Sequence, residues 1–378
     1  MRPLSVLYLI HTLGQGGAQR QLVTLVNALD RTRIRPEVAF YYDLDLLRPE
    51  LERTGTPVHV LGLHGAKDPR VALRLALLID RSDFDIVHCF LNTPGVLARL
   101  AVLSRGGPKI ILSERSVDLG SLPWTLPLER MLSYRADAVV VNAPVVRRHV
   151  EGVLPRWRGR VHIVPNGVSW KEPTPEQLRR AGDLRDRYCI RDDGVLLSSV
   201  GRLSREKNPL LLLDAFAMLS AESRRKLSVI WVGASRDESL KKVVEERVRL
   251  FGVSDHFHLL PETNDIGSVY VASDAVVLTS CWEGSPNSVL EALASGTPVI
   301  ATDVGDVHEM VVTGRTGWLV PPEDVPAMAA AISGAVATPR AALVRMGREG
   351  AKLVLSERST EKLVERTEAV YRHVLSDT

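Results

Sequence analysis

The stretch EGSPNSVLEALASGTPVIATDVG, from Glu283 to Gly305, predicts the element around which the chain is organised. Ser285 suits the N-cap of a helix, and Pro286 suits its first position, where the missing N–H costs nothing. An apolar helical stripe follows, and GTPVIAT then predicts a turn and a short buried strand. An apolar strand at residues 274–279 precedes the loop. A helix N-terminus at the end of a strand is suited to holding a phosphate.

Length and composition indicate a protein of two domains. The chain has 378 residues, 45% of them hydrophobic, so each half can bury a core. Cys89, Cys189 and Cys281 show no paired spacing, which favours a reducing cytosol over a disulfide framework or a zinc site. No signal peptide is expected, and no apolar run approaches the roughly 20 residues that span a bilayer. We therefore expect a cytoplasmic protein.

The charge is distributed unevenly between the two halves. Residues 1–170 carry 22 Lys and Arg against 15 Asp and Glu, a net charge of +7, whereas residues 171–378 carry 26 against 30, a net charge of −4. A basic N-terminal half favours an anionic partner, either a phosphorylated acceptor or the inner face of a membrane, although a scattered solvated surface explains it equally well. The basic motifs of common nucleic-acid modules are absent, so no nucleic-acid partner is expected. The densest basic run comprises Arg147, Arg148, Arg156, Arg158 and Arg160.

In the first half, strands alternate with helices. An apolar strand near residue 5 runs into the glycine-rich turn of Gly14, Gly16 and Gly17, and a helix follows. Alternating strands and helices predict an α/β fold with a doubly wound parallel sheet. Further strands are predicted at 36–41, 58–61, 86–90 and 109–113, with a helix at 70–81.

Polar side chains follow three of these strands, where ligands of parallel sheets bind. His11 lies beside the glycine-rich turn. The other two sets are His88 with Asn92, and Glu114 with Arg115. They predict an acceptor site, although loop residues whose polar groups are hydrogen-bonded within the protein would give the same pattern. Residues 119–131, rich in Leu and Pro, suggest an acceptor flap, a membrane-touching segment or a buried loop.

The turn Pro165-Asn166-Gly167 marks a domain boundary. We expect an N-terminal acceptor-side domain at 1–168, a nucleotide-sugar-binding domain at 169–358, and a C-terminal helix at 359–378 that could pack back on the first domain. The second domain begins again with a strand at 195–200. Arg202 and Lys207 then flank a strand–helix loop, an arrangement suited to a diphosphate, although ordinary loop charges would look the same.

The chain resembles the family 4 retaining glycosyltransferases of the GT-B fold, in which two Rossmann-like doubly wound domains face each other across a cleft. Order and spacing match along nearly the whole chain, and the pair of Glu residues in its strand–loop–helix–strand context is the most specific feature. The motifs that carry the resemblance are GGAQR (Gly16 to Arg20), VPNGV (Val164 to Val168), VGRLSREKNP (Val200 to Pro209), the stretch Ser273 to Gly305, and GWLVPPED (Gly317 to Asp324).

The resemblance implies that a nucleotide-diphospho-sugar donor is bound mainly by the second domain. Glu283 would accept hydrogen bonds from the sugar hydroxyls, and Glu291 would bind the ribose hydroxyls. Read as an acid/base pair, the two carboxylates would suit a glycosidase, but they lie eight positions apart around a helix start and have different groups to serve. The diphosphate would face the backbone amides of Asn287, Ser288 and Val289.

The resemblance also implies catalysis without a metal or another cofactor. Arg202 and Lys207 would neutralise the departing diphosphate, and the loop of Gly16 and Gly17 would close on it from the first domain. Many family members carry a His after the strand at 109–113, whereas this chain has Glu114 there. The favoured function is transfer of a sugar onto a glycan, lipid-linked or small-molecule acceptor. One alternative is a nucleotide-sugar epimerase or a phosphorylase-like enzyme of the same fold. Another is a non-catalytic nucleotide-sugar-binding protein.

Overall fold

The chain divides into two compact units. Unit 1 comprises Met1–Gly167 and Arg358–Thr378, and unit 2 comprises Val168–Glu357. The last helix, placed at 359–378 by the sequence, therefore belongs to unit 1. The structure is a computed structural model, and it describes residues 2–62, 68–102, 107–115, 125–170, 172–188 and 194–376.

Unit 1 is built on a seven-stranded parallel sheet with the order β3-β2-β1-β4-β5-β6-β7. The order reverses between β1 and β4. The strands are β1 Leu4–Leu9, β2 Ile34–Phe40, β3 Val58–Val60, β4 Ile86–Phe90, β5 Lys109–Glu114, β6 Ala138–Val141 and β7 Val161–Ile163. The helices are α1 Gly17–Ala28, α2 Arg48–Glu52, α3 Pro69–Asp80, α4 Asn92–Ala101, α5 Thr125–Leu132, α6 Pro144–Val153 and α15 Thr360–Ser376, with 3-10 turns η1 Ser133–Arg135 and η2 Pro155–Trp157.

Unit 2 contains a six-stranded parallel sheet with the order β10-β9-β8-β11-β12-β13, which reverses between β8 and β11. Its strands are β8 Val195–Val200, β9 Leu227–Val232, β10 Phe257–Leu260, β11 Ala275–Leu278, β12 Val299–Thr302 and β13 Gly317–Val320. The helices are α7 Pro175–Tyr188, α8 Pro209–Met218, α9 Ala221–Lys226, α10 Glu238–Leu250, α11 Ile266–Ala272, α12 Asn287–Ala294, α13 Val325–Ala337 and α14 Arg340–Glu357, with 3-10 turns η3 Arg205–Lys207 and η4 Val307–Glu309.

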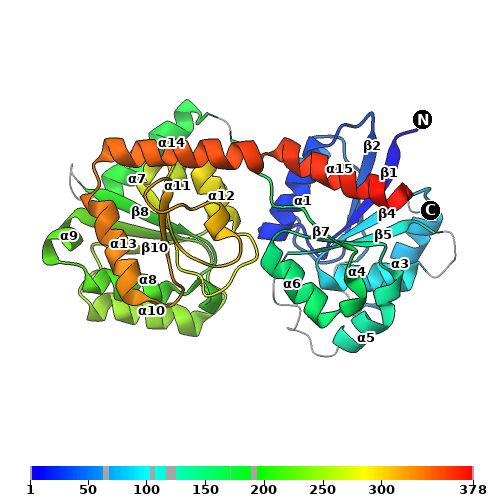
Figure 1. Cartoon of the computed structure of the whole chain (residues 1–378), viewed down its shortest axis with the longest axis horizontal. Coiled ribbons are helices and arrows are strands. Elements are labelled where there is room, and N and C mark those ends of the chain that lie inside the picture. Colours follow the sequence, from blue (N-terminus) through cyan, green and yellow to red (C-terminus); the bar gives the residue numbers. More distant parts are fainter. Residues whose placement is uncertain are drawn as a thin grey trace. The chain divides into compact units, whose positions relative to one another are not determined.

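Both sheets are buried on both faces, which explains why their strands are continuous apolar runs. In β8, Leu197 packs into the core beneath α8, α10 and α13, whereas Leu196 packs into the core on the opposite face. In unit 1, α15 covers the face that α1 also covers (Figure 1). Tyr371 of α15 is 1% exposed and lies in this core. The C-terminal helix is therefore an integral part of unit 1.

Among the described residues, no single helix has the length and apolar composition of a membrane span; only α13 and α14 taken together, across a bend of 114°, pass that test.

Candidate active site

The candidate donor residues of unit 2 gather where the strand order of its sheet reverses. Lys207 lies in the loop after β8, and Glu283 lies in the loop after β11. These two strands are neighbours in the sheet and run parallel, so both loops emerge at the same edge. In open α/β sheets this reversal point is where ligands bind.

Lys207 and Glu283 form an ion pair across these two loops. Lys207 Nζ contacts Glu283 Oε1, and the two side chains are 18% and 17% exposed. Ser280 Oγ donates a second hydrogen bond of 2.7 Å to the same Oε1 atom. Among the described residues, nothing in the protein donates to Glu283 Oε2. One oxygen of this carboxylate is therefore fixed in place, and the other is available to accept hydrogen bonds from a ligand.

Backbone interactions hold the two loops together. Thr279 Oγ1 donates to the carbonyl oxygen of Lys207 at 2.7 Å, and the amide of Cys281 donates to the carbonyl oxygen of Glu206 at 2.8 Å. Asn208 adopts a left-handed conformation, with φ of 46°, and its side chain accepts from the amide of Leu211 to cap α8. These bonds explain why Lys207 and Glu283 meet although they are 76 residues apart.

Arg202 also follows β8 but has a different environment. Its Nη2 atom pairs with Glu206 Oε1 at 2.8 Å, and its side chain is 58% exposed. An exposed pair of this kind contributes little to stability, so the guanidinium can move to a ligand at small cost.

The second acidic residue, Glu291, is positioned by a buried tyrosine. Tyr270 of α11 is 1% exposed and donates a 2.9 Å hydrogen bond from its hydroxyl to Glu291 Oε2. The pKa of Tyr270 is raised well above its ordinary value, mainly because burial disfavours the phenolate and secondly because Glu291 is close. Tyr270 therefore acts as a permanent hydrogen-bond donor to this carboxylate.

Helix α12 begins one residue later than expected. Pro286, with φ of −73° and ψ of 116°, occupies the N-cap and Asn287 is the first helical residue, so the assignment of the N-cap to Ser285 was wrong. Proline has no side-chain oxygen for capping, and its own backbone already fits the extended N-cap geometry. The amides of Asn287, Ser288 and Val289 therefore begin a helix without a capping side chain, as an anion site requires.

Gly305 allows the loop after β12 to close against the Glu283 loop. Its φ is +64°, and a Cβ atom there would lie 2.3 Å from the carbonyl oxygen of Gly284. The next amide, of Asp306, donates to that same oxygen at 3.2 Å. Only glycine fits both the backbone angle and the space.

In unit 1, His11 and the glycine-rich turn lie together after β1. Gly16 occupies the N-cap of α1 in an extended conformation, with φ of −139°, and Gly17 is the first helical residue. The Gln19 side chain folds over Gly16, and its Nε2 atom lies 3.5 Å from Nε2 of His11. Burial lowers the pKa of His11, so its imidazole is neutral near pH 7.

His88 lies in the core of unit 1, 1% exposed, with both ring nitrogens engaged. Nδ1 is 2.7 Å from the hydroxyl of Tyr371, and Nε2 is 3.0 Å from Oγ of Ser113. Because Tyr371 donates its own proton to the hydroxyl of Tyr8, it accepts from Nδ1–H of His88. Burial, assisted by Arg115, lowers the pKa of His88 to about 3, so the imidazole is neutral. In this structure His88 anchors α15.

Glu114 and Arg115 follow one another at the end of β5 and are both strongly desolvated. Glu114 is 5% exposed, and burial together with the nearby Glu129 raises its pKa from 4.5 to about 8. Burial lowers the pKa of Arg115 to about 10, and its Nη1 atom donates to Asn166 Oδ1 at 2.7 Å. Near neutral pH, Glu114 is therefore mostly an uncharged acid and Arg115 a cation.

Asn92, the first residue of α4, belongs to a buried polar cluster with Arg99 and Glu129. Arg99 Nη2 and Glu129 Oε2 are 2.5 Å apart, and their side chains are 0% and 3% exposed. Burial raises the pKa of Glu129, outweighing the charge of Arg99 and a hydrogen bond from Asn92, which both favour the ionised form. The preceding Leu91 has φ of +74°, a strained conformation for a branched residue.

Sequence reasoning missed four residues of these sites. Ser280 and Tyr270 support the two donor-site carboxylates, and Arg99 and Glu129 support Asn92. The one available signal was Arg99 itself, a single charge within the apolar helical run VLARLAVL. Tyr270 and Glu291 are 21 residues apart and Arg99 and Glu129 are 30 apart, so neither pair shows as a local pattern. Of the segment 119–131, residues 119–124 lie outside the described residues.

Both units thus contain a parallel sheet with the strand order of a Rossmann fold, and the chain has the GT-B fold. Two family descriptions match it: "Glycosyltransferase Family 4" over residues 15–171 and "Glycosyl transferases group 1" over residues 182–353. The chain belongs to this family of glycosyltransferases, as its motifs predicted.

Three similar proteins illustrate the relationship. EpsD of Bacillus subtilis (strain 168), named as a glycosyltransferase, is 29% identical over 291 residues, which is 75% of each chain. The D-inositol 3-phosphate glycosyltransferase of Geodermatophilus obscurus is 34% identical over 246 residues, 62% of this chain and 53% of that protein. The crystal structure of Anabaena HepE in complex with UDP and glucose has a TM-score of 0.84 at 18% identity, covering 98% of this chain and 99% of HepE. At that identity the likeness concerns the fold.

Proposed function

We propose that this chain is a retaining, metal-independent glycosyltransferase that moves a sugar from a nucleotide-diphospho-sugar to an acceptor hydroxyl. The observation that carries the proposal is the Lys207–Glu283 pair at the strand-order reversal of unit 2. It places a cation for a phosphate and a carboxylate for a sugar side by side. Glu283 Oε2 would accept from the sugar hydroxyls while Oε1 stays bound to Lys207 and Ser280.

The departing diphosphate determines the role of the cations. As the bond from the anomeric carbon to the phosphate oxygen breaks, both electrons move to that oxygen, and its negative charge grows. Lys207 and the first amides of α12 would stabilise this charge because they are positioned before the reaction begins, and Arg202 would move from Glu206 to join them. These protein cations would perform the neutralisation that other transferases leave to a divalent metal.

Glu291 would hold the nucleotide. A carboxylate accepts hydrogen bonds from the two adjacent hydroxyls of a ribose, and the buried Tyr270 hydroxyl restricts Glu291 to one orientation. HepE, which was crystallised with UDP and glucose, supports a uridine nucleotide as the first donor to be tested.

The anomeric configuration is retained if the acceptor attacks the sugar from the same face that the diphosphate leaves. The acceptor oxygen forms a bond to the anomeric carbon, and its proton passes to the departing phosphate oxygen. No covalent bond to Glu283 is needed, because Glu283 is bound to Lys207 and positions sugar hydroxyls. The transfer therefore needs neither a redox partner nor a protein-bound intermediate.

Unit 1 would bind the acceptor through Asn92, Glu114 and Arg115. With its raised pKa, Glu114 would donate a hydrogen bond to an acceptor oxygen near neutral pH. The cation of Arg115 would suit an acceptor phosphate, a reading supported by similarity to a D-inositol 3-phosphate glycosyltransferase. His88, with both nitrogens engaged, would act by positioning α15 and Ser113.

A peripheral contact with an anionic membrane would bring a lipid-linked acceptor to unit 1. Of the basic run in unit 1, most members are exposed, namely Arg148, Arg156, Arg158 and Arg160. Salt-sensitive binding to anionic vesicles is expected, and equal binding to neutral vesicles would contradict the idea.

The decisive test incubates the protein with a panel of nucleotide sugars, with and without candidate acceptors, while nucleotide release is measured. Release that depends on an acceptor supports transfer. Interconversion of the donor without an acceptor identifies an epimerase, and binding without turnover identifies a binding protein. The anomeric configuration of the product, read by NMR, tests retention, and activity in the presence of EDTA tests independence from metal.

A further inference from the structure

Unit 2 contains a cavity at the other end of its sheet from the donor loops. Its volume is about 690 Å³. The turn that precedes β13 contributes to it, and because all strands of this sheet are parallel, that turn lies at their amino ends, whereas Lys207 and Glu283 follow their carboxyl ends. The cavity is therefore separate from the proposed donor site. Its lining comprises Gly314, Arg315, Trp318, Thr338, Ala342, Arg345, Met346, Arg348 and Glu349.

One wall of the cavity is α14, whose orientation is fixed by two glycines. A Cβ atom on Gly347 would lie 1.7 Å from the carbonyl oxygen of Gly296, and one on Gly350 would lie 2.6 Å from Cδ2 of Leu293. The helix therefore packs closely against the end of α12 and the turn after it. Arg345 precedes Gly347 by two residues, or roughly 200° around the helix, and so points away from that contact.

The lining of the cavity contains more cationic than anionic side chains. Arg315 pairs with Glu349, the only acidic residue of the lining, at 3.3 Å. Arg345 and Arg348 are exposed, and within the described residues neither has a hydrogen-bond or ion-pair partner. The half of the chain that contains them, residues 171–378, has a net charge of −4. The positive charge is thus a local property of this cavity.

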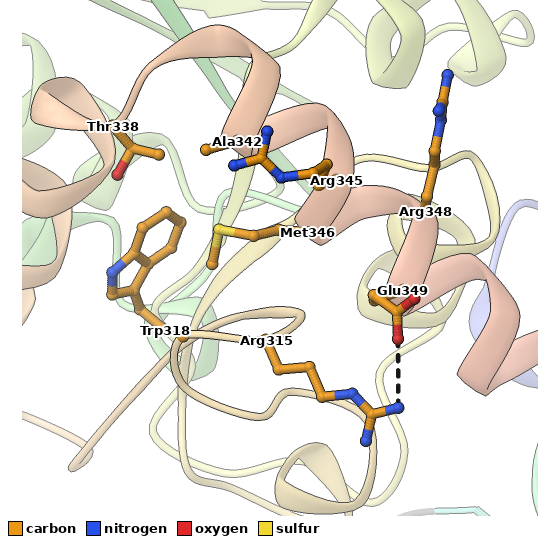
Figure 2. Close-up of a pocket in the computed structure, with 9 residues that line it drawn as sticks. Arg315, Trp318, Thr338, Ala342, Arg345, Met346, Arg348 and Glu349 are labelled. Carbon is orange, nitrogen blue, oxygen red and sulfur yellow. Dashed lines mark hydrogen bonds and ion pairs between the residues drawn. The ribbon is translucent and has the colours of Figure 1, made fainter.

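The side chains of the lining also provide an apolar surface. Figure 2 shows Arg345 running along α14 toward Ala342, on the side of Met346 and Trp318, whereas Arg348 points away from them. The indole of Trp318 is half-buried. An indole face and a thioether bind aromatic or aliphatic groups.

We propose that this cavity binds a phosphate group carried on an aromatic or aliphatic body. Guanidinium groups match the geometry of phosphate oxygens and form charge-assisted hydrogen bonds to them. A phosphate ester, with close to two negative charges at neutral pH, would pair directly with Arg345, and Arg348, which points away, would add only longer-range attraction. Its body would lie on Trp318 and Met346. A soluble phosphate ester and the headgroup of an anionic lipid share this chemistry.

The test measures binding of phenyl phosphate to the full-length protein by calorimetry, with phenol as the uncharged control. We expect phenyl phosphate to bind and phenol not to bind. Arg345→Ala and Trp318→Ala should each weaken binding about tenfold, and Arg348→Ala, whose side chain points away, by less than about threefold. The surface variant Lys241→Ala, whose side chain lies outside both the cavity and the donor site, should bind as well as wild type.

Vesicles distinguish the two sources of the phosphate. Because unit 1 is itself expected to bind anionic vesicles, sedimentation uses a background variant in which Arg148, Arg156, Arg158 and Arg160 are replaced by Ala. In this background, phosphatidylglycerol vesicles compared with pure phosphatidylcholine vesicles report binding of a lipid headgroup by the cavity. Binding to the anionic vesicles that Arg345→Ala abolishes supports the lipid source, and binding of phenyl phosphate alone supports the soluble source. The proposal is overturned if phenyl phosphate does not bind the wild type and the anionic vesicles do not bind the background variant, or if adding Arg345→Ala leaves both measurements unchanged. Thermal melting of each variant verifies that it is folded.

Discussion

The hydroxyl of Tyr270 donates a 2.9 Å hydrogen bond to Oε2 of Glu291. Tyr270 is itself immobilised, because its side chain is 1% exposed and its carbonyl oxygen accepts from Thr297 Oγ1 at 2.9 Å. The carboxylate proposed to bind ribose is therefore oriented before any donor arrives. Preorganisation of this kind reduces the entropy lost on binding.

Removing this hydroxyl should weaken donor binding and leave the chemical step nearly intact. In Tyr270→Phe, Glu291 loses a hydrogen bond to a charged group, an interaction of about 1.5–3 kcal/mol. We expect KM for the nucleotide sugar to rise about tenfold with kcat within about threefold of wild type. Tyr188→Phe, in the same unit but with its ring against His258, is the matched control. An unchanged KM would show that Glu291 does not hold the donor.

The Arg99–Glu129 pair should be essential to the stability of unit 1. Glu129→Ala leaves a fully buried guanidinium uncompensated, at a cost of about 3–5 kcal/mol. Glu151→Ala, which removes a surface partner of Arg147, should cost at most about 1 kcal/mol. Thermal melting and urea denaturation of the two variants provide the comparison. Equal effects would show that burial of the first pair has no energetic consequence.

Glu114 should make the protein less stable as the pH rises. Its folded pKa, about 8, lies above its ordinary value of 4.5, so the folded state binds its proton more tightly than the unfolded state does. The free energy of unfolding therefore falls between pH 4.5 and 8 through this group. His88 has the opposite effect below pH 6.5, because its folded pKa is lowered to about 3.

The variant Glu114→Gln isolates this contribution. Its stability relative to wild type should increase from pH 5 to pH 8 and level off above that, as measured by urea denaturation at each pH. A difference that stays constant with pH would mean that Glu114 titrates near its ordinary value, despite its burial and the nearby Glu129.

Gly305 should be intolerant of a side chain for reasons beyond its backbone angle. Gly305→Ala adds a Cβ atom 2.3 Å from the carbonyl oxygen of Gly284, whereas Gly252, with nearly the same φ of +63°, has nothing within 4 Å of its Cβ position. Gly252→Ala should therefore cost only about 1–2 kcal/mol, for the left-handed backbone. Gly305→Ala should cost more and also reduce turnover, because the Glu283 loop must shift. Similar losses in both variants would contradict the proposed close packing.

The fold was largely readable from the sequence, because buried parallel strands are continuous apolar runs between turn residues. The predicted strands at 86–90 and 195–200 coincide with β4 and β8. The 18-residue helix α14 was not predicted. Its Gly347 and Gly350 weaken the local helical signal, and they are there because the helix packs against another backbone.

The site could be predicted only as far as its residues are local in sequence. The loops that carry Lys207 and Glu283 follow predicted strands, and the family resemblance assigned both residues to the same donor. The partners that orient the charged groups are contributed by other elements, as Tyr270 is for Glu291 and Tyr371 for His88. Such contacts depend on how helices pack on the sheet, which one-dimensional patterns do not specify.

We propose that Lys207 and Glu283 bind and activate a nucleotide-sugar donor. The most direct test is acceptor-dependent nucleotide release by Lys207→Ala and Glu283→Ala, measured beside the surface control Lys241→Ala. We expect each site variant to lose at least about 100- to 1,000-fold in turnover while its melting curve stays cooperative, and Lys241→Ala to match wild type. Turnover close to wild type in either site variant would contradict it.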